Sequence, residues 1–327
     1  MLAAELTAIG PAHDVVVAKD VPDPGSPGAG RVVVRVEACS INPADILLIE
    51  GKYAARPQVP SLIGIEAAGV IEAIGPGVER VVVGDRVLSL GRANWAQKLD
   101  LAETEVVLLP PEIDLEQAAM MKVNLATAWR MLTDYVPVGA GQWVIQSAAN
   151  SGVGVNLIKL AASEGIRTVN VVRRSELIEP LMDIGADVVV VDGPDLAHRV
   201  HDATGNAEIR LGIDAVAGSL VQRMGDCMAE GGVLVNYGLL SGDPCQLTAD
   251  QVVFKGLTLT GFWLAKVMRG MSHSEISDMY AGLAQRVVDG TISVPVVARY
   301  PLSEIQAALK HAGTYGRDGK VLLRPNG

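Results

Sequence analysis

Hydrophobic positions divide the chain into a first part with strand-like alternation and a later part in which strand-like and helix-like runs take turns. Between residues 13 and 118 the pattern is strand-rich: Arg31–Ala38 alternates apolar and polar positions, and Val81–Leu90 predicts two strands separated by a turn. Residues 116–132 have helical spacing. From residue 143 onward strands and helices alternate, which predicts a doubly wound parallel sheet.

The clearest unit in this pattern lies between residues 143 and 174. Trp143–Ser147 is a short apolar run typical of a buried strand, and Ala148–Gly154 is a turn of small residues. A helical pattern follows and is ended by Gly165, after which Thr168–Val172 predicts a second strand. Strand, turn, helix and strand together make one βαβ unit.

The turn of this unit is a candidate dinucleotide site, because its backbone amides lie at the N-terminus of a helix, where a pyrophosphate binds well. The glycine fingerprint of such sites would fall on Ala149, Ser151 and Gly154, and only the last is glycine. An ordinary tight turn is the alternative. The residues expected to bind the cofactor here are Asn150, Ser151, Gly152, Val153 and Gly154.

The end of the second strand bears on the choice of cofactor. NAD-binding units place a carboxylate about 20 residues after the glycines, where it accepts a hydrogen bond from the ribose 2′-hydroxyl. Here Arg173 and Arg174 stand at that place. Guanidinium groups suit a 2′-phosphate, so the sequence predicts NADPH, with a solvated charged loop as the alternative.

Length and composition exclude several classes of protein. At 327 residues, with 49% hydrophobic and 20% charged residues, the chain is long enough for about two domains with a sizeable core. No apolar run reaches the ~18 residues that cross a bilayer, and the N-terminus lacks the pattern of a secretory signal. Three unclustered cysteines indicate a reducing compartment, and a net charge of −10 argues against nucleic acid as a partner.

The order of the patterns indicates that the cofactor domain is inserted in a second domain. Strand-rich sequence precedes it, and shorter strands and helices follow residue 257. We expect residues 119–257 to form the cofactor domain, and residues 1–118 with 258–327 to form the other.

Several stretches resemble the medium-chain dehydrogenase/reductase superfamily, beginning with Gly69–Val87 and Gly319–Leu323. More specific stretches resemble the mitochondrial-type trans-2-enoyl thioester reductases, whose close cousins are the NADPH:quinone oxidoreductases; these are Ile41–Tyr53, Val123–Leu132, Val144–Gly154, Thr168–Arg173 and Gly261–Leu264. The resemblance implies an α/β fold in which a Rossmann doubly wound parallel sheet is inserted into a β-rich GroES-like catalytic domain.

The resemblance also bears on metal. Zinc-dependent members carry a cysteine ligand where Asn42 stands and a histidine where Ile65 stands. Neither side chain here replaces a thiolate or imidazole on tetrahedral zinc, so we expect no metal. The substrate should then carry its own electrophile, a conjugated C=C–C=O group that takes a hydride at the β-carbon and a proton at the α-carbon.

Tyr53 matches the position of the catalytic tyrosine in the resembled family, and its phenol can donate a hydrogen bond or a proton. Asn42 is the second catalytic candidate, orienting the nicotinamide or the substrate carbonyl. The alternatives are a packed loop aromatic for Tyr53 and a cap before Pro43 for Asn42.

Four further residues are expected at the cofactor. Thr127 could donate to the nicotinamide or its ribose, or bond back to its own helix turn. Tyr237 closes a parallel strand at its carboxyl end, where ligands bind in open sheets. The resemblance places Phe262 and Trp263 at the acyl pocket and nicotinamide, with a core role as the alternative for Phe262.

Three hypotheses on function follow: an NADPH-dependent enoyl thioester reductase, an NADPH:quinone oxidoreductase, or a non-catalytic NADPH-binding protein. Acyl carrier protein is left open as a partner, with Lys122, Arg130, Lys266 and Arg269 as the basic residues that would meet it. The resemblance implies a homodimer that pairs through a strand near Val252–Thr260. We expect a cytoplasmic protein, or one of the mitochondrial matrix if the source is eukaryotic.

Overall fold

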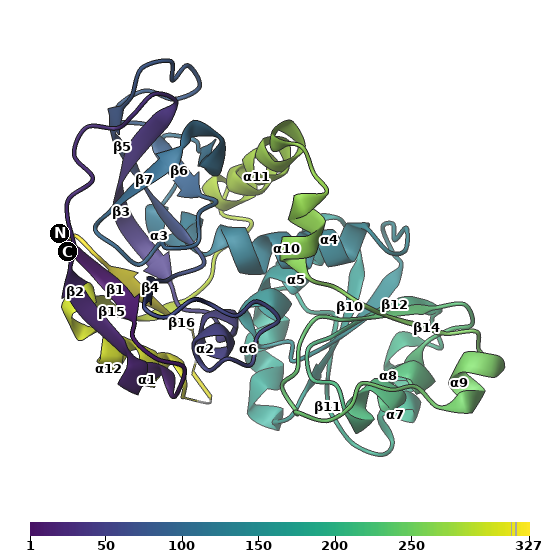
Figure 1. The fold of residues 1–327 in the computed structure, drawn as a ribbon. Helices are drawn as coiled ribbons and strands as arrows, with labels where there is room; N and C mark the ends of the chain where they lie inside the picture. The colour runs from purple at the N-terminus through teal and green to yellow at the C-terminus, as the bar shows by residue number, and fades with distance from the viewer. Residues whose placement is uncertain (315, 318) are drawn as a thin grey trace. The chain divides into compact units, whose positions relative to one another are not determined.

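The computed structural model describes residues 1–314, 316–317 and 319–327. The described chain forms two units (Figure 1). Unit 1 consists of Met1–Val123 and Met271–Gly327, and unit 2 is the continuous stretch Asn124–Gly270. The domain limits expected from the sequence, after residues 118 and 257, both lie earlier in the chain than the limits of these units.

Unit 1 is built on two β-sheets, one of three strands in the order β2-β1-β4 and one of seven strands. The larger sheet has the order β15-β16-β3-β5-β6-β8, and β7 pairs with β3. The strands are β1 (Leu2–Leu6), β2 (Val16–Asp20), β3 (Arg31–Ser40), β4 (Ser61–Leu62), β5 (Ala67–Ile74), β6 (Arg86–Ser89), β7 (Lys98–Ala102), β8 (Val106–Leu108), β15 (Val296–Pro301) and β16 (Lys320–Arg324). The helices are α1 (Ala12–Val15), α2 (Pro43–Ile49), α3 (Leu115–Ala118), α11 (His273–Val288) and α12 (Ile305–Ala312).

The last strand of the chain lies inside the larger sheet of unit 1. β16 pairs in parallel with β15 and antiparallel with β3, where Leu322 faces Ser40 and Leu323 faces Cys39. The core of unit 1 therefore joins residues from both ends of the sequence, with Leu6, Trp95 and Leu323 all buried in one cluster.

One strand prediction in this unit is wrong. Of the strand pair expected over Val81–Leu90, only β6 forms, and residues 81–85 make a turn. The turn is closed by the Asp85 carboxylate, which accepts a hydrogen bond from the Val82 backbone N–H at 2.8 Å. Val82 and Val83 are exposed, so their β-branched side chains do not pair with a strand or enter the core.

Unit 2 contains the predicted doubly wound parallel sheet. Its six strands have the order β11-β10-β9-β12-β13-β14, and every neighbouring pair is parallel. The strands are β9 (Trp143–Ser147), β10 (Arg167–Val172), β11 (Val188–Val191), β12 (Ile209–Asp214), β13 (Val233–Asn236) and β14 (Thr258–Gly261). The helices are α4 (Ala126–Thr133), α5 (Gly152–Ser163), α6 (Ile178–Asp183), α7 (Leu196–Thr204), α8 (Ser219–Cys227), α9 (Ala249–Val253) and α10 (Leu264–Arg269). Figure 1 shows α4 and α5 on one face of the sheet and α7 and α8 on the other.

Helix α5 ends as the sequence predicts. Gly165 has a positive φ of 68° and lies just beyond the helix. Its N–H donates to Ala162 O at 3.1 Å and the N–H of Ile166 donates to Ala161 O at 2.8 Å. These are the two bonds of a Schellman cap, which lets the chain turn directly into β10.

The helix expected over residues 116–132 forms in pieces. It is divided into α3, a π-helical turn at Met121–Leu125, and α4. π-helical turns are rare and occur often at functional sites. No helix among the described residues is long and apolar enough to span a membrane.

Candidate active site

The N-terminus of α5 has the features of an anion site. Ser151 caps the helix, and its Oγ accepts a hydrogen bond from Gly154 N at 3.1 Å. The N–H groups of Gly152 and Val153 have no acceptor in the described part of the chain. Gly154 is needed for close packing, because a Cβ there would lie 2.5 Å from Ala149 O. Two backbone donors at the positive end of a helix of 12 residues are therefore available to a ligand.

Two polar side chains adjoin this helix end. The Tyr237 hydroxyl is hydrogen-bonded to Ser151, and burial raises the pKa of Tyr237, so the phenol stays protonated. The Asn124 amide lies beside Gly152, since a Cβ on that glycine would be 3.3 Å from Asn124 Cγ. The structure thus brings together Ser151 and Tyr237, two predicted cofactor residues, and adds Asn124, which the sequence analysis did not single out.

The strand order of unit 2 reverses between β9 and β12, and a buried carboxylate organises the chain at that point. Asp214, the last residue of β12, is 0% exposed. It accepts four hydrogen bonds: from Ser147 Oγ at 2.6 Å, Val216 N at 3.0 Å, Ala217 N at 2.8 Å and Asn236 Nδ2 at 2.7 Å. The carboxyl ends of β9, β12 and β13 are thereby tied together at the place where open α/β sheets bind ligands.

The turns after β9 and β12 also carry backbone strain. Ala148 has a φ of 48° and Ala217 a φ of 66°, in the left-handed region that residues with a Cβ seldom adopt. Strain of this kind clusters at binding sites, where the surrounding contacts fix the conformation. Asp214 supplies such a contact for Ala217.

The two arginines after β10 differ in their surroundings. Both are exposed, and Arg174 forms an ion pair with Glu176 at 3.3 Å. Arg173 makes no hydrogen bond or ion pair with any residue that the structure describes. With the α5 amides at the end of the neighbouring strand, a free guanidinium here fits a nucleotide that carries a 2′-phosphate.

Asn150 and Thr127, also predicted at the cofactor, differ in their exposure. Asn150 is exposed in the turn, and Thr127 is only 6% exposed on α4. The Thr127 hydroxyl makes no hydrogen bond within the described residues, whereas Thr133 on the same helix donates back to Trp129 O at 3.0 Å. The structure therefore does not show the backward bond that was the alternative for Thr127.

Phe262 and Trp263 follow β14. Phe262 is buried and packs edge-on against Tyr135, with ring centroids 6.5 Å apart, which supports the core alternative for this residue. Trp263 is partly exposed before α10, and the Arg269 guanidinium lies 5.2 Å from its ring centroid.

In unit 1 a buried polar network surrounds Asn42. Asn42 precedes α2, and its backbone N–H donates to Asp45 Oδ2 at 2.9 Å, which begins the helix as in a capping box. Its side-chain amide donates to Glu66 Oε1 at 2.6 Å and to Ser40 Oγ at 3.0 Å. The Lys320 ammonium donates to Asn42 Oδ1 at 2.5 Å. Both amide protons are thus used within unit 1, and an orienting role for Asn42 toward the nicotinamide or substrate stays a prediction.

The same network does not fit zinc. The only ligating oxygen of Asn42 is already used, since Lys320 Nζ donates to it at 2.5 Å, and Ile65 has no ligating side-chain atom. In the described parts of the chain, no group of three or more His, Cys, Asp or Glu side chains could hold a metal ion.

Burial perturbs two charged groups at the edge of this network. Desolvation lowers the pKa of Lys122 to about 7, and its ammonium donates to Ile65 O and Gly91 O, both at 2.6 Å. Desolvation, with a contribution from the charge of Glu66, raises the pKa of Asp45 to about 7. Asp45 is held by the N–H groups of Asn42 and Ile65, and none of these contacts was predicted from the sequence.

Tyr53 lies in the loop after α2 and is partly buried. It is the only aromatic residue between Ile41 and Pro60, so the loop presents one phenol in this part of unit 1. The catalytic role of Tyr53 stays a prediction.

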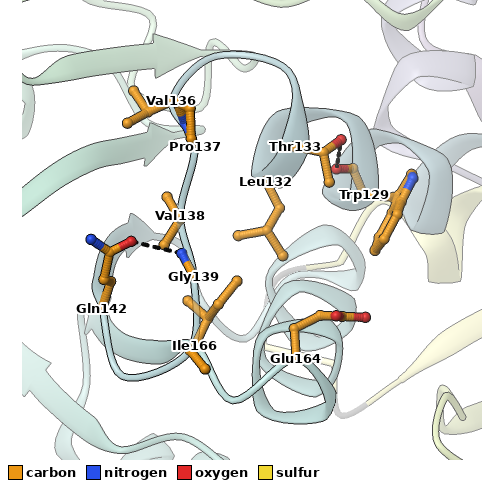
Figure 2. Close-up of a pocket in the computed structure, with 11 residues that line it drawn as sticks. Trp129, Leu132, Thr133, Val136, Pro137, Val138, Gly139, Gln142, Glu164 and Ile166 are labelled. Atoms are coloured by element: carbon orange, nitrogen blue, oxygen red, sulfur yellow. Dashed lines mark hydrogen bonds between the residues drawn. The ribbon is translucent and has the colours of Figure 1, made fainter.

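Each unit contains a cavity. In unit 1 a cavity of about 260 Å³ lies among α2, the loop of residues 55–58, residues 61–65 and Arg92. In unit 2 a cavity of about 470 Å³ is lined by Trp129, Leu132, Val138, Glu164, Ile166 and neighbours (Figure 2). The second lies at the amino ends of β9 and β10, at the opposite edge of the sheet from the α5 N-terminus, so it is not the nucleotide site.

Comparison with known proteins agrees with this architecture. Residues 28–106 match a family model described as an alcohol dehydrogenase GroES-like domain, and residues 152–284 match one described as a zinc-binding dehydrogenase. The mitochondrial enoyl-[acyl-carrier-protein] reductase of Bos taurus is 33% identical over 293 residues, which cover 86% of this chain and 78% of that protein. The chain belongs to the medium-chain dehydrogenase/reductase superfamily.

As a member of this superfamily the chain is an oxidoreductase. Among solved structures, the Escherichia coli quinone oxidoreductase complexed with NADPH has a TM-score of 0.88 at 25% identity, covering 99% of this chain and all of that chain. A mycobacterial quinone oxidoreductase has a TM-score of 0.87 at 29% identity, with 99% and 100% coverage. The expected fold, a parallel Rossmann-type sheet joined to a GroES-like domain, is confirmed.

Proposed function

We propose that this oxidoreductase uses NADPH to reduce the carbon–carbon double bond of trans-2-enoyl thioesters, linked to CoA or to an acyl carrier protein. The observation that carries the proposal is the 33% identity to a mitochondrial enoyl-[acyl-carrier-protein] reductase along 86% of the chain. The name of this relative supports the mitochondrial matrix if the source is eukaryotic, and in a bacterial source we expect the protein in the cytosol.

Features of unit 2 support NADPH as the cofactor. The amides of Gly152 and Val153 would receive the pyrophosphate, and Arg173 the 2′-phosphate. The solved E. coli relative is a complex with NADPH. When bound, NADPH supplies the hydride that the β-carbon of the substrate accepts.

The protein then has to hold the cofactor and supply a proton. The Thr127 hydroxyl, which has no partner in the described part of the chain, would donate to the nicotinamide or its ribose. Tyr53 donates a hydrogen bond to the thioester oxygen, which gains negative charge as the β-carbon is reduced, or a proton to the α-carbon. No step needs a metal, because the conjugated carbonyl already activates the double bond.

A second function has a specific observation in its favour. The two quinone oxidoreductase structures match this chain along nearly its whole length at 25% and 29% identity. Reduction of a quinone would use the same nucleotide site and a different acceptor. A non-catalytic NADPH-binding protein is the third hypothesis.

NADPH consumption at 340 nm separates these functions. We expect turnover with crotonyl-CoA or a longer trans-2-enoyl-CoA that exceeds turnover with a benzoquinone or naphthoquinone. Tyr53→Phe should lower kcat by about 10²-fold or more while the Kd for NADPH stays unchanged. Turnover with the quinone alone would refute the enoyl reductase proposal, and NADPH binding without turnover of either substrate would favour the third hypothesis.

We also propose that the protein is a homodimer. Strand β14 is an edge of the six-stranded sheet, and an unpaired edge is a template for a second strand. Val252, Val253 and Phe254 precede it and are exposed, Phe254 to 76%. The pairing strand is Thr258–Gly261 rather than the whole of the expected stretch, because Val252 and Val253 belong to helix α9. A second copy of the chain would cover both the strand edge and this apolar patch.

A further inference from the structure

The cavity of unit 1 has walls that are mostly apolar. Leu48 and Ile49 come from α2, and Leu62, Ile63 and Ile65 come from the segment that contains β4. Its volume of about 260 Å³ is enough for a short chain of carbon atoms and one polar group. An apolar wall of this kind binds the body of a small molecule without specifying its charged end.

Two arginines line the same cavity, and both lack partners. Arg56 and Arg92 are exposed, and neither makes a hydrogen bond or an ion pair with any described residue. Lys122 lies nearby, since its ammonium is bonded to Gly91 O, but its pKa of about 7 leaves it charged for only part of the time at neutral pH.

The one acidic group in the cavity does not neutralise them. Asp45 is 2% exposed and spends its two carboxylate oxygens on the backbone N–H groups of Asn42 and Ile65, at 2.9 and 3.0 Å. Burial keeps its pKa near 7, so the group is uncharged for a large part of the time at neutral pH. Ser61, also in the cavity wall, has a buried Oγ with no hydrogen-bond partner in the described structure. The cavity therefore offers positive charge, and an unbonded hydroxyl lies buried in its wall.

We propose that this cavity holds an oxoanion, a carboxylate or a phosphate, that belongs to the thioester substrate, with Arg56 and Arg92 as its ligands. The inference rests on the proposed function and extends it to substrate recognition. Guanidinium groups match the geometry of both oxoanions and can grip them through two parallel hydrogen bonds. The anion has two sources in such a substrate: the far end of the acyl chain, or the phosphopantetheine of the carrier.

Three of the four basic residues expected from the sequence to meet a carrier already have other contacts. Lys122 is bonded to two carbonyl oxygens, Arg130 pairs with Asp134 at 2.7 Å, and Arg269 lies over Trp263. Arg56 and Arg92 were not singled out, because the sequence places them 36 positions apart in loops and gives no sign that one cavity joins them.

Calorimetric titration with three unreactive saturated thioesters tests the proposal. Butyryl-pantetheine carries no anion, butyryl-4′-phosphopantetheine carries a phosphate on the carrier side, and glutaryl-pantetheine carries a carboxylate on the acyl side. Each is titrated into the wild-type protein, into the double variant Arg56→Ala/Arg92→Ala, and into Arg80→Ala. Arg80 is a matched control, since it is an exposed arginine of unit 1 whose side chain has no partner in the described structure.

In the wild type and in Arg80→Ala, we expect one anionic ligand to bind about tenfold or more tightly than butyryl-pantetheine. In the double variant this advantage should fall below about threefold, with an unchanged Tm. An advantage for the phosphate identifies the carrier, and one for the carboxylate identifies a dicarboxylic acyl chain.

Equal binding of all three ligands by the wild type, or an advantage that persists in the double variant, would overturn the proposal. Turnover of crotonyl-pantetheine with NADPH is measured separately. If the wild type does not turn over crotonyl-pantetheine, the enoyl reductase function is contradicted. The titrations decide the anion site independently of that result.

Discussion

Removal of the Asp214 carboxylate is the most direct test of how unit 2 builds its nucleotide site. Asp214→Ala leaves four donors at the carboxyl edge of the sheet without their acceptor: the Ser147 hydroxyl, the Asn236 amide and the N–H groups of Val216 and Ala217. A buried donor without a partner costs about 1–3 kcal/mol, and water entering the space relieves part of this. We expect the free energy of unfolding of Asp214→Ala to be lower than that of the wild type by about 3–5 kcal/mol.

Two further variants serve as comparisons for the stability loss of Asp214→Ala. Asp214→Asn keeps the shape and one accepting oxygen, so about half of the loss should return. Asp187→Ala removes an exposed carboxylate at the amino ends of the strands, where it accepts one backbone hydrogen bond, from Thr168 N at 2.9 Å. This change should lower the free energy of unfolding by about 1 kcal/mol or less.

Equilibrium denaturation and the Kd for NADPH are the two measurements. Because Asp214 also fixes the strained turn at Ala217, the Kd should rise about tenfold in Asp214→Ala and stay unchanged in Asp187→Ala. If Asp214→Ala unfolded at the same denaturant concentration as Asp187→Ala and bound NADPH as the wild type does, the assignment of Asp214 to the frame of the site would be wrong.

Three other changes have expected outcomes. Arg173→Ala should raise the Kd for NADPH about tenfold or more and leave that for NADH unchanged; equal effects on both cofactors would contradict a 2′-phosphate contact. Phe254→Asp should convert the dimer to a monomer in size-exclusion chromatography with light scattering, and a variant that elutes unchanged would argue against the proposed interface. The pKa of Asp45 is about 7 in the folded protein and about 3.8 in the unfolded chain, so the folded state binds this proton more tightly. The contribution of Asp45 to the free energy of unfolding is therefore complete below about pH 4 and is lost as the pH rises through 7. In Asp45→Asn, the free energy of unfolding measured by denaturation between pH 4.5 and 8 should no longer show this loss. An identical pH dependence in the variant and the wild type would contradict the raised pKa of Asp45.

The sequence predicted the βαβ unit closely because its signals are local. Trp143–Ser147 is apolar over the whole length of β9, and Gly165 has the positive φ that its place after α5 requires. Strand length, helix period and a glycine cap can all be read within about ten residues of each other. The pair expected at Val81–Leu90 failed in part: the turn and β6 formed, but the β-branched run before the turn was taken for a strand although Val82 and Val83 are exposed and unpaired.

The polar networks could not be predicted in the same way. Asn42 and Lys320 meet across 278 positions of sequence, and Ser147 and Asp214 across 67. Each of these residues has an ordinary local context, and only the pairing of β16 with β3, or of β9 with β12, makes them neighbours. The same holds for Arg56 and Arg92, which one cavity joins although no motif does.

The position of β16 has a consequence for how the protein is made. Because β16 lies between β15 and β3 in the larger sheet of unit 1, that sheet stays open until residues 320–324 have been made. Unit 2 is continuous in sequence and can fold on the ribosome while the N-terminal half of unit 1 still lacks this strand. We expect a chain truncated before Lys320 to carry a folded nucleotide domain and an open sheet edge in unit 1, and to aggregate.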